Sequence, residues 1–152
     1  MVKIQNILFT TDFSEDSAYA LPYARDMAEK FGAKLYILHV INNPISSIYG
    51  PPHGDYLAME ANARAKTREM MTKYDNVLRD FPNHELVIKE GDVAERILET
   101  LKEKNIGTVV IGTHGGGVLR QFVMGSTTRK VLNNVECPVL AVRHPDRKIP
   151  KA

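Results

Sequence analysis

Short apolar runs and segments of helical periodicity alternate along this chain, and that alternation constrains its fold more than any other feature. The strand-like runs are Ile4–Thr10, Lys34–Ile41, Glu85–Lys89, Thr108–Ile111 and Pro138–Arg143. The helical patterns between them run from Ser14 to Gly32 and over Tyr56–Arg79, Val93–Lys104 and Ser126–Asn134. Strands that alternate with helices are typical of a parallel sheet with right-handed crossovers and helices on both faces.

The length and composition indicate one soluble domain. The chain has 152 residues, which suits a single α/β domain, and we expect this domain to span residues 1–145 with a polar tail at 146–152. Asn42–Asp55 holds three prolines and two glycines, so we expect a long loop or lid there rather than a domain boundary.

Charge and cysteine content exclude several classes of function. The net charge is +2 and no dense block of Lys and Arg occurs, so we expect neither a nucleic acid nor a membrane as partner. The single cysteine, Cys137, cannot form an internal disulfide. The first residues do not resemble a signal peptide, so we expect a cytoplasmic protein.

The residues that follow each strand are the candidate site, because ligands of open α/β sheets bind at the carboxyl ends of the strands. Glycine-rich Gly112–Gly117 follows the fourth strand, and Gly125 and Ser126 then open a helix. Glycine backbones and a helix N-terminus both bind anions. The segment contains neither a P-loop nor the G-x-G-x-x-G fingerprint. By itself it indicates an anion site, with a tight turn and a helix-capping Ser126 as the alternative.

The pattern Gly112-x2-Gly115-x9-Gly125-Ser126 resembles the G-2x-G-9x-G-[S/T] signature of the ATP-binding branch of the universal stress protein family. NILFTTDFSEDSAYAL, LHVI, EGDVAERILE and CPVLAVR resemble further segments of that family, in the same order. The resemblance therefore covers nearly the whole chain. It implies a Rossmann-like, adenine nucleotide alpha hydrolase-like fold: an open five-stranded parallel sheet of order 3-2-1-4-5.

The resemblance also implies a set of ATP contacts. Asp12 matches an aspartate near the ribose and phosphates that helps to hold Mg or Mn through the nucleotide. Val40 matches a residue whose backbone reads the adenine edge. The other implied contacts are Thr10, Thr11, Gly112, Gly115, Gly125, Ser126 and Thr127. The family often has proline or valine before the aspartate, whereas this chain has Thr10-Thr11.

Individual residues also admit structural interpretations. Asp12 could be a turn residue, and Arg120 could approach the γ-phosphate or be a solvated loop charge. We expect His39 to be a core histidine with its hydrogen bonds satisfied, and His114 to pack or orient the loop. We expect Arg129 and Lys130 to be exposed. Histidines at metal-ligand spacing are absent from the sequence, so no zinc site is predicted.

The sequence thus predicts an ATP-binding protein of stress response or signalling, with at most slow hydrolysis, because it lacks the clamp of a phosphoryl-transfer enzyme. The alternatives are a slow ATPase or nucleotidyl-transferring enzyme at the same site, a nucleotide-independent interaction protein, and AMP or a cyclic nucleotide as ligand. Pro138–Arg143 should form an apolar edge strand, which invites pairing with a second chain. Since the family commonly dimerises through this strand, we expect a homodimer.

Overall fold

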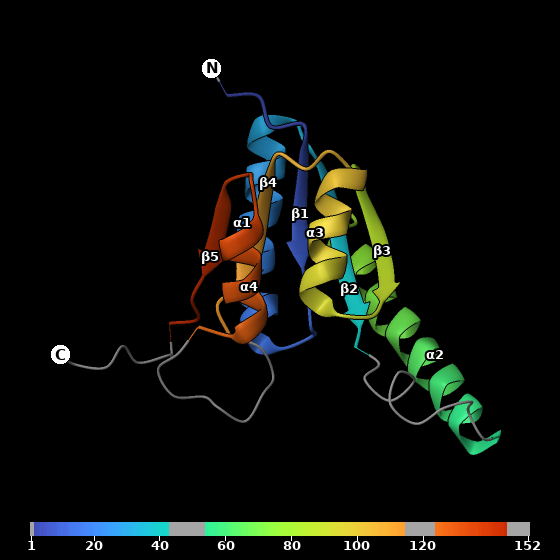
Figure 1. Ribbon diagram of the computed structural model, residues 1–152. Helices are drawn as coiled ribbons and strands as arrows, with labels where there is room; N and C mark the ends of the chain where they lie inside the picture. Colours follow the sequence, from blue (N-terminus) through green and yellow to red (C-terminus); the bar gives the residue numbers. More distant parts are fainter. Residues whose placement is uncertain (1, 43–53, 115–123, 146–152) are drawn as a thin grey trace.

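A computed structural model describes residues 2–42, 54–114 and 124–145 and forms a three-layer α/β sandwich (Figure 1). The five strands lie in the order β3-β2-β1-β4-β5 and all neighbours are parallel, which confirms the predicted topology. In chain order the elements are β1 (Asn6–Thr10), α1 (Glu15–Phe31), β2 (Lys34–Ile41), α2 (Gly54–Val77), β3 (His84–Glu90), α3 (Val93–Glu103), β4 (Thr108–Gly112), α4 (Ser126–Asn134) and β5 (Val139–Val142).

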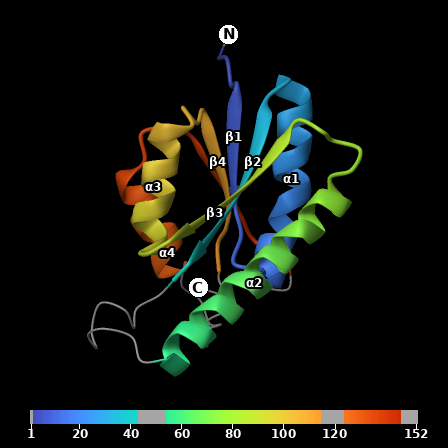
Figure 2. The ribbon, with the colours of Figure 1, turned by 90° about the vertical axis from the view of Figure 1, so that its right-hand side faces the viewer.

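Two hydrophobic cores lie on opposite faces of the sheet because neighbouring strand residues point to opposite sides. On β1, Ile7 and Phe9 join the core beneath α1 and α2, whereas Leu8 joins the core beneath α3 and α4. Figure 2 shows the two helix pairs on either side of the sheet. Val109 and Val110 on β4 divide between the faces in the same way. Burial on both faces explains why the central strands are almost continuously apolar.

Helix α1 begins and ends as its sequence predicts. The Ser14 hydroxyl at the N-cap accepts a hydrogen bond from the Ser17 N–H, and Gly32 at the C-cap adopts a left-handed conformation with φ of 62°. Pro22 lies inside α1, where it has no N–H to donate, yet the helix is continuous through it. Its side chain is exposed, so the cost of the missing N–H falls on the solvent side of the helix.

Some element boundaries differ from those predicted. Strand β1 begins at Asn6 instead of Ile4, because its pairing with β2 starts at Asn6 opposite Lys34. Strand β5 begins after Pro138, which has no N–H to donate to the ladder. Helix α2 spans Gly54–Val77 instead of Tyr56–Arg79. It ends before a turn in which the Phe81 N–H donates to the Leu78 carbonyl.

Helix α2 is anchored mainly through its second half. Met71 and Leu78 are buried in the core, whereas Leu57 and Met59 near its start are exposed. Figures 1 and 2 show the first turns of the helix running past the end of the sheet. Arg64 joins this part to β3 through an ion pair with Glu90, and it also pairs with Glu60 one turn earlier on α2.

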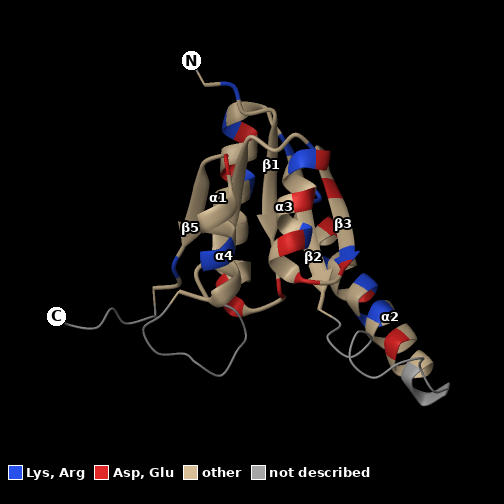
Figure 3. Cartoon of the chain, viewed as in Figure 1, with Lys and Arg blue, Asp and Glu red and all other residues tan. Residues whose placement is uncertain are grey.

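Charged side chains of both signs alternate along α2 and α3, while the central strands carry apolar residues (Figure 3). Among the described residues, no helix has both the length and the apolar character that crossing a membrane requires. The predicted tail at 146–152 and most of the predicted Asn42–Asp55 loop lie outside the described residues.

Candidate functional site

The candidate site lies where the chain order reverses, at the carboxyl ends of β1 and β4. From β1 the chain adds β2 and β3 on one side, and it later adds β4 and β5 on the other. Thr10 ends β1 and Gly112 ends the neighbouring strand β4. Both residues are buried, and Asp12 follows on the exposed turn after β1. The sheet therefore brings together the two segments that the sequence singled out.

Gly112 lies tightly against the start of helix α1. A Cβ atom at this position would lie 3.2 Å from the backbone carbon and oxygen of Asp16 and 3.3 Å from the Ser17 nitrogen. The Gly112 carbonyl accepts a hydrogen bond from the buried Thr128 hydroxyl at 3.0 Å. Gly112 thus allows β4, α1 and α4 to converge, a packing role in addition to the predicted contact with ligand.

The two ends of the segment between β4 and α4 are hydrogen-bonded to each other. The Gly125 N–H donates to the Thr113 carbonyl at 2.8 Å, and the Thr113 N–H donates to Val142 of β5 at 3.0 Å. The Thr113 hydroxyl and His114 Nδ1 lie 2.8 Å apart, and both side chains are buried. His114 therefore packs at the base of the loop, as predicted. Gly115 and Arg120 lie outside the described residues.

Among the residues that the structure describes, no side chain caps the N-terminus of α4. Gly125 occupies the N-cap, and the first turn, Ser126 to Thr128, contains no acidic residue. By contrast, Ser14 caps α1 and Asp92 caps α3, each followed by acidic residues in the first turn. Ser126 is exposed and Thr127 is partly exposed. The positive end of the α4 dipole therefore lies beside the end of β4, where an anion would be stabilised.

Side-chain hydrogen bonds fix the turn from β1 into α1. The Phe13 N–H donates to the Thr11 hydroxyl at 3.0 Å, and the Ser14 N–H donates to Oδ1 of Asp12 at 3.0 Å. Phe13 has a φ of 62°, a left-handed conformation that is unfavourable for a bulky residue. The carboxylate of Asp12 is exposed. Asp12 thus shapes the turn and also reaches the surface at the predicted site.

The backbone of Thr11 is engaged by β2. Its N–H donates to the Leu38 carbonyl at 2.9 Å, and its carbonyl lies 2.8 Å from Nδ1 of His39. Because a carbonyl can only accept, Nδ1 carries the proton of the neutral His39 ring. Burial lowers the pKa of His39, opposed by the hydrogen bond to Thr11 and by the charge of Asp12. His39 is therefore half-buried instead of lying in the core, whereas the hydrogen bond of its Nδ1 is satisfied as predicted.

The backbone of Val40 faces the side of β2 on which β1 ends. The Leu38 carbonyl points towards β1, and strand alternation directs the N–H and carbonyl of Val40 the same way. The pairing of β1 with β2 ends at Thr10 opposite Leu38. Val40 therefore offers one backbone donor and one acceptor just beyond the end of β1, an arrangement suited to the polar edge of a flat ring.

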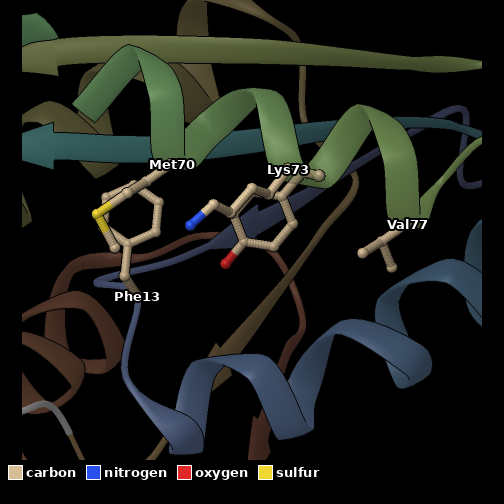
Figure 4. A pocket seen from close by; sticks show the side chains of 5 residues that line it. Phe13, Met70, Lys73 and Val77 are labelled. Carbon is tan, nitrogen blue, oxygen red and sulfur yellow. The ribbon is translucent and has the colours of Figure 1, made fainter. Parts of the chain in front are cut away.

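A small apolar groove of about 200 Å³ lies beside the turn, beneath α2 (Figure 4). It is lined by Phe13, Met70, Lys73, Tyr74 and Val77. The Phe13 ring stacks on His39, with ring centroids 4.3 Å apart, and lies 6.2 Å from Tyr74. The groove marks the junction at which α2 meets the candidate site.

Metal ligands are sparse around this site. Across residues 2–42, 54–114 and 124–145, no group of three or more His, Cys, Asp or Glu side chains could hold a metal ion. Asp12 alone offers a carboxylate at the predicted position. One carboxylate suits Mg²⁺ that takes its other ligands from phosphates and water, because this ion dehydrates reluctantly and keeps several waters.

Sequence reasoning missed several residues that shape the site. Tyr74 and Thr128 make long-range hydrogen bonds, to Thr11 and to Gly112 respectively. Tyr74 shares a helical stripe with Met71 and Leu78, at the spacing i, i+3 and i+7, and that spacing could have indicated an inward-facing tyrosine. Arg129 and Lys130 are exposed as expected, and Lys130 pairs with the α3 cap Asp92.

Comparison with known proteins identifies the family. The model of the universal stress protein family matches residues 3–143. Universal stress protein MJ0531 of Methanocaldococcus jannaschii is 27% identical over 95% of this chain and 85% of its own length. The structure of universal stress protein UspA from Lactobacillus plantarum superposes with a TM-score of 0.82, at 26% identity over 94% of this chain and 100% of the other.

A universal stress protein from Archaeoglobus fulgidus in complex with dAMP shares the fold. Its TM-score is 0.64, at 17% identity over 93% of this chain and 99% of that one. The family model covers nearly the whole chain, and the strand order agrees with the fold that the sequence resemblance implied. The chain therefore belongs to the universal stress protein family.

Proposed function

We propose that this chain binds ATP at the carboxyl ends of β1 and β4 and acts in stress response or signalling through its binding state. The observation that carries the proposal is the N-terminus of α4, which no described side chain caps. Hydrogen bonds from Thr128 to Gly112 and from Gly125 to Thr113 hold it beside the end of β4. A helix end of this kind stabilises phosphate through free N–H groups and its dipole.

The proposed ligand lies across both strand ends. Adenine contacts the backbone N–H and carbonyl of Val40, and the phosphates lie over the start of α4, where the Ser126 and Thr127 hydroxyls donate to them. Gly115 and Gly125 allow the backbone to approach the phosphates closely. Thr10, Thr11 and Gly112 complete the site. The last two support it from behind, since their backbone groups already bond within the fold.

Asp12 is the proposed link to a divalent metal. Its Oδ1 accepts the Ser14 N–H, which orients the carboxylate on the exposed turn. A Mg²⁺ or Mn²⁺ ion that arrives with the nucleotide would supply charge neutralisation for the phosphates, with Asp12 as its ligand from the protein. Arg120, if it approaches the γ-phosphate, would add a second positive charge.

The dAMP complex of the Archaeoglobus fulgidus relative supports an adenine nucleotide as the ligand class. The sequence signature favours ATP within that class. To identify the ligand directly, the purified protein is denatured and any released nucleotide is measured by mass. Competition of AMP and cyclic AMP against a labelled ATP analogue then ranks the ligands.

Thermal unfolding with Mg-ATP tests the proposal in solution. A ligand that binds only the folded state adds about 2.7 kcal/mol to the free energy of unfolding at one hundred times its Kd. We therefore expect the Tm to rise with ATP concentration. An unchanged Tm at millimolar Mg-ATP would favour the nucleotide-independent interaction protein.

Ser126→Asp separates binding from stability. A carboxylate in the first turn of α4 should stabilise the helix by about 0.3–1 kcal/mol. The same charge would repel the phosphates, so we expect ATP affinity to fall about ten-fold or more. Asn133→Asp is the matched control, because it adds the same charge at the exposed far end of α4. Equal ATP affinity in both variants would show that the phosphates do not bind at this end of the helix.

Hydrolysis is a separate question at the same site. Incubation with ATP and magnesium, followed by product analysis, distinguishes a binder from a slow ATPase or nucleotidyl-transferring enzyme. Asp12 and a metal are the only groups at the described part of the site that we assign to such chemistry, so we expect turnover to be slow.

The proposal includes a homodimer in the cytoplasm. Strand β5 lies at the edge of the sheet, and its residues Val139 and Leu140 are only partly buried. Tyr23 and Leu132, on the helices beside this edge, expose 45% and 37% of their surface. An apolar edge strand with such neighbours favours pairing with a second copy of the chain.

A further inference from the structure

Helix α2 makes a side-chain hydrogen bond to the candidate site through Tyr74. The Tyr74 hydroxyl lies 2.5 Å from the Thr11 hydroxyl, and the Thr11 hydroxyl lies 3.2 Å from that of Ser17 on α1. The Tyr74 ring also packs edge-on against Phe9, with centroids 6.0 Å apart. These contacts link α2 with the turn that carries Asp12, although Asp12 and Tyr74 are 62 positions apart in the sequence.

Because each hydroxyl has one proton to donate, the donor and the acceptor of each of these hydrogen bonds can be assigned. The Ser17 hydroxyl donates to the Ser14 carbonyl at 2.9 Å, so its oxygen accepts from Thr11. The Thr11 hydroxyl has one proton, which goes to Ser17, and therefore it accepts from Tyr74 and from the Phe13 N–H. A continuous chain of hydroxyls thus runs from Tyr74 to the N-cap of α1. Hydrogen bonds in such a chain strengthen one another.

The same turn is strained and needs support. Phe13 has a positive φ, and its ring is held between His39 and Tyr74. A non-glycine residue in this conformation persists only where its surroundings over-determine it. The hydrogen bond between Tyr74 and Thr11 supplies part of that support.

A groove of about 200 Å³ lies beside this contact, lined by residues of α2 and by Phe13 of the turn. Val77, which lines the groove, is 62% exposed. Figure 4 shows Phe13 and Met70 at one end of the groove and Val77 at the other. Tyr74 therefore contacts the turn in two ways, through its ring against Phe13 and through its hydroxyl on Thr11.

We propose that Tyr74 is a positioning residue through which helix α2 sets the affinity of the nucleotide site, by holding the Thr11-Asp12-Phe13 turn. This inference rests on the proposed ATP function. Docked α2 fixes the Asp12 carboxylate for a nucleotide-borne metal, and a displaced α2 releases the turn. Nucleotide binding must in return stabilise the docked position of α2, because coupling between two equilibria is reciprocal.

Tyr74→Phe tests the proposal, because it removes the hydroxyl and keeps the ring. The loss of one hydrogen bond at the turn should weaken Mg-ATP binding about three- to ten-fold, measured by isothermal titration. Tyr23→Phe is the matched control, since it removes an exposed hydroxyl from α1 whose described contact is Tyr19. Val77→Ala controls for altered packing in the groove, and both controls should bind Mg-ATP like wild type.

Amide hydrogen exchange distinguishes a positioning role of Tyr74 from a purely structural one, because only the positioning role couples α2 to nucleotide binding. In the wild type, saturating Mg-ATP should slow amide exchange over residues 67–77 of α2, and in Tyr74→Phe this protection should be reduced. Unchanged affinity in Tyr74→Phe, or no protection of α2 in the wild type, would overturn the proposal. Failure of the wild type to bind any adenine nucleotide would overturn the proposed function as well, so the two failures are distinguishable.

Discussion

At the residue scale, Gly112 shows how a glycine of a binding signature can serve packing. We predict that Gly112→Ala destabilises the protein by about 1–3 kcal/mol, because the added methyl would meet the backbone of Asp16 and Ser17 at 3.2–3.3 Å. Backbone atoms at a helix start cannot move away as a side-chain end can. Gly107→Ala is the control, since its methyl would lie at least 3.4 Å from its neighbours. Urea unfolding measures both, and equal losses would refute the close-packing argument.

Individual residues also show which parts of the candidate site could be predicted from the sequence and which could not. Asp12, Thr10 and Gly112 were predicted because position after a strand and a local pattern suffice to select them. The link between Thr11 and Tyr74 was not predicted, because it depends on how α2 packs on a sheet built from distant segments. The tautomer of His39 likewise follows only from the Thr11 carbonyl opposite its ring.

At the scale of elements, Glu85 joins β3 to two neighbours. Its carboxylate pairs with Lys34 of β2 at 2.6 Å and with Lys104 after α3 at 3.0 Å, and both ammonium groups lie over the Tyr36 ring. Hydrogen bonds from Lys34 and then Lys104 lower the pKa of Glu85. Its stabilising effect should therefore be complete above the carboxyl pKa of the unfolded chain and be lost as pH falls through the lower folded value.

Glu85→Gln tests this cluster. We expect the variant to be less stable than wild type at pH 7, by a modest amount because the charges are partly exposed, and the difference should vanish in acid. Exposed Glu29 on α1 offers a control, Glu29→Gln, with the same change in charge. Urea unfolding between pH 3 and pH 7 measures the difference. A constant difference across that range would show that Glu85 stabilises the fold without its charge.

The elements themselves were largely predictable, and their ends were less so. Ser14 and Gly32 delimit α1 as predicted because capping is local chemistry. Strand β1 is shorter than its apolar run, because its ladder starts only where β2 lies opposite. Helix α2 has weak amphipathicity, so the sequence predicted a helix but not which face packs or how it meets the turn.

At the scale of the whole molecule, the backbone geometry of β5 indicates how two copies would pair. The Val109 N–H donates to the Pro138 carbonyl and the Thr113 N–H to the Val142 carbonyl. Strand alternation therefore turns the N–H and carbonyl groups of Val139 and Ala141 outwards, away from β4. An edge that presents such groups is a template for another strand.

Ala141→Pro is the corresponding test, because it removes one outward N–H and leaves the ladder to β4 intact. We expect the wild type to sediment as a dimer at micromolar concentration and Ala141→Pro to shift towards monomer. Ala141→Ser keeps the N–H and should remain dimeric, and circular dichroism checks that both variants fold. A monomeric wild type would refute the dimer itself. If Ala141→Pro remained dimeric, the interface would have to lie elsewhere than at the edge of β5. The Val142 carbonyl of β5 accepts a hydrogen bond from the Thr113 N–H just after β4, so a dimer through β5 would lie one strand from the proposed ATP site. If ATP binds there, Mg-ATP should slow the dissociation of the dimer.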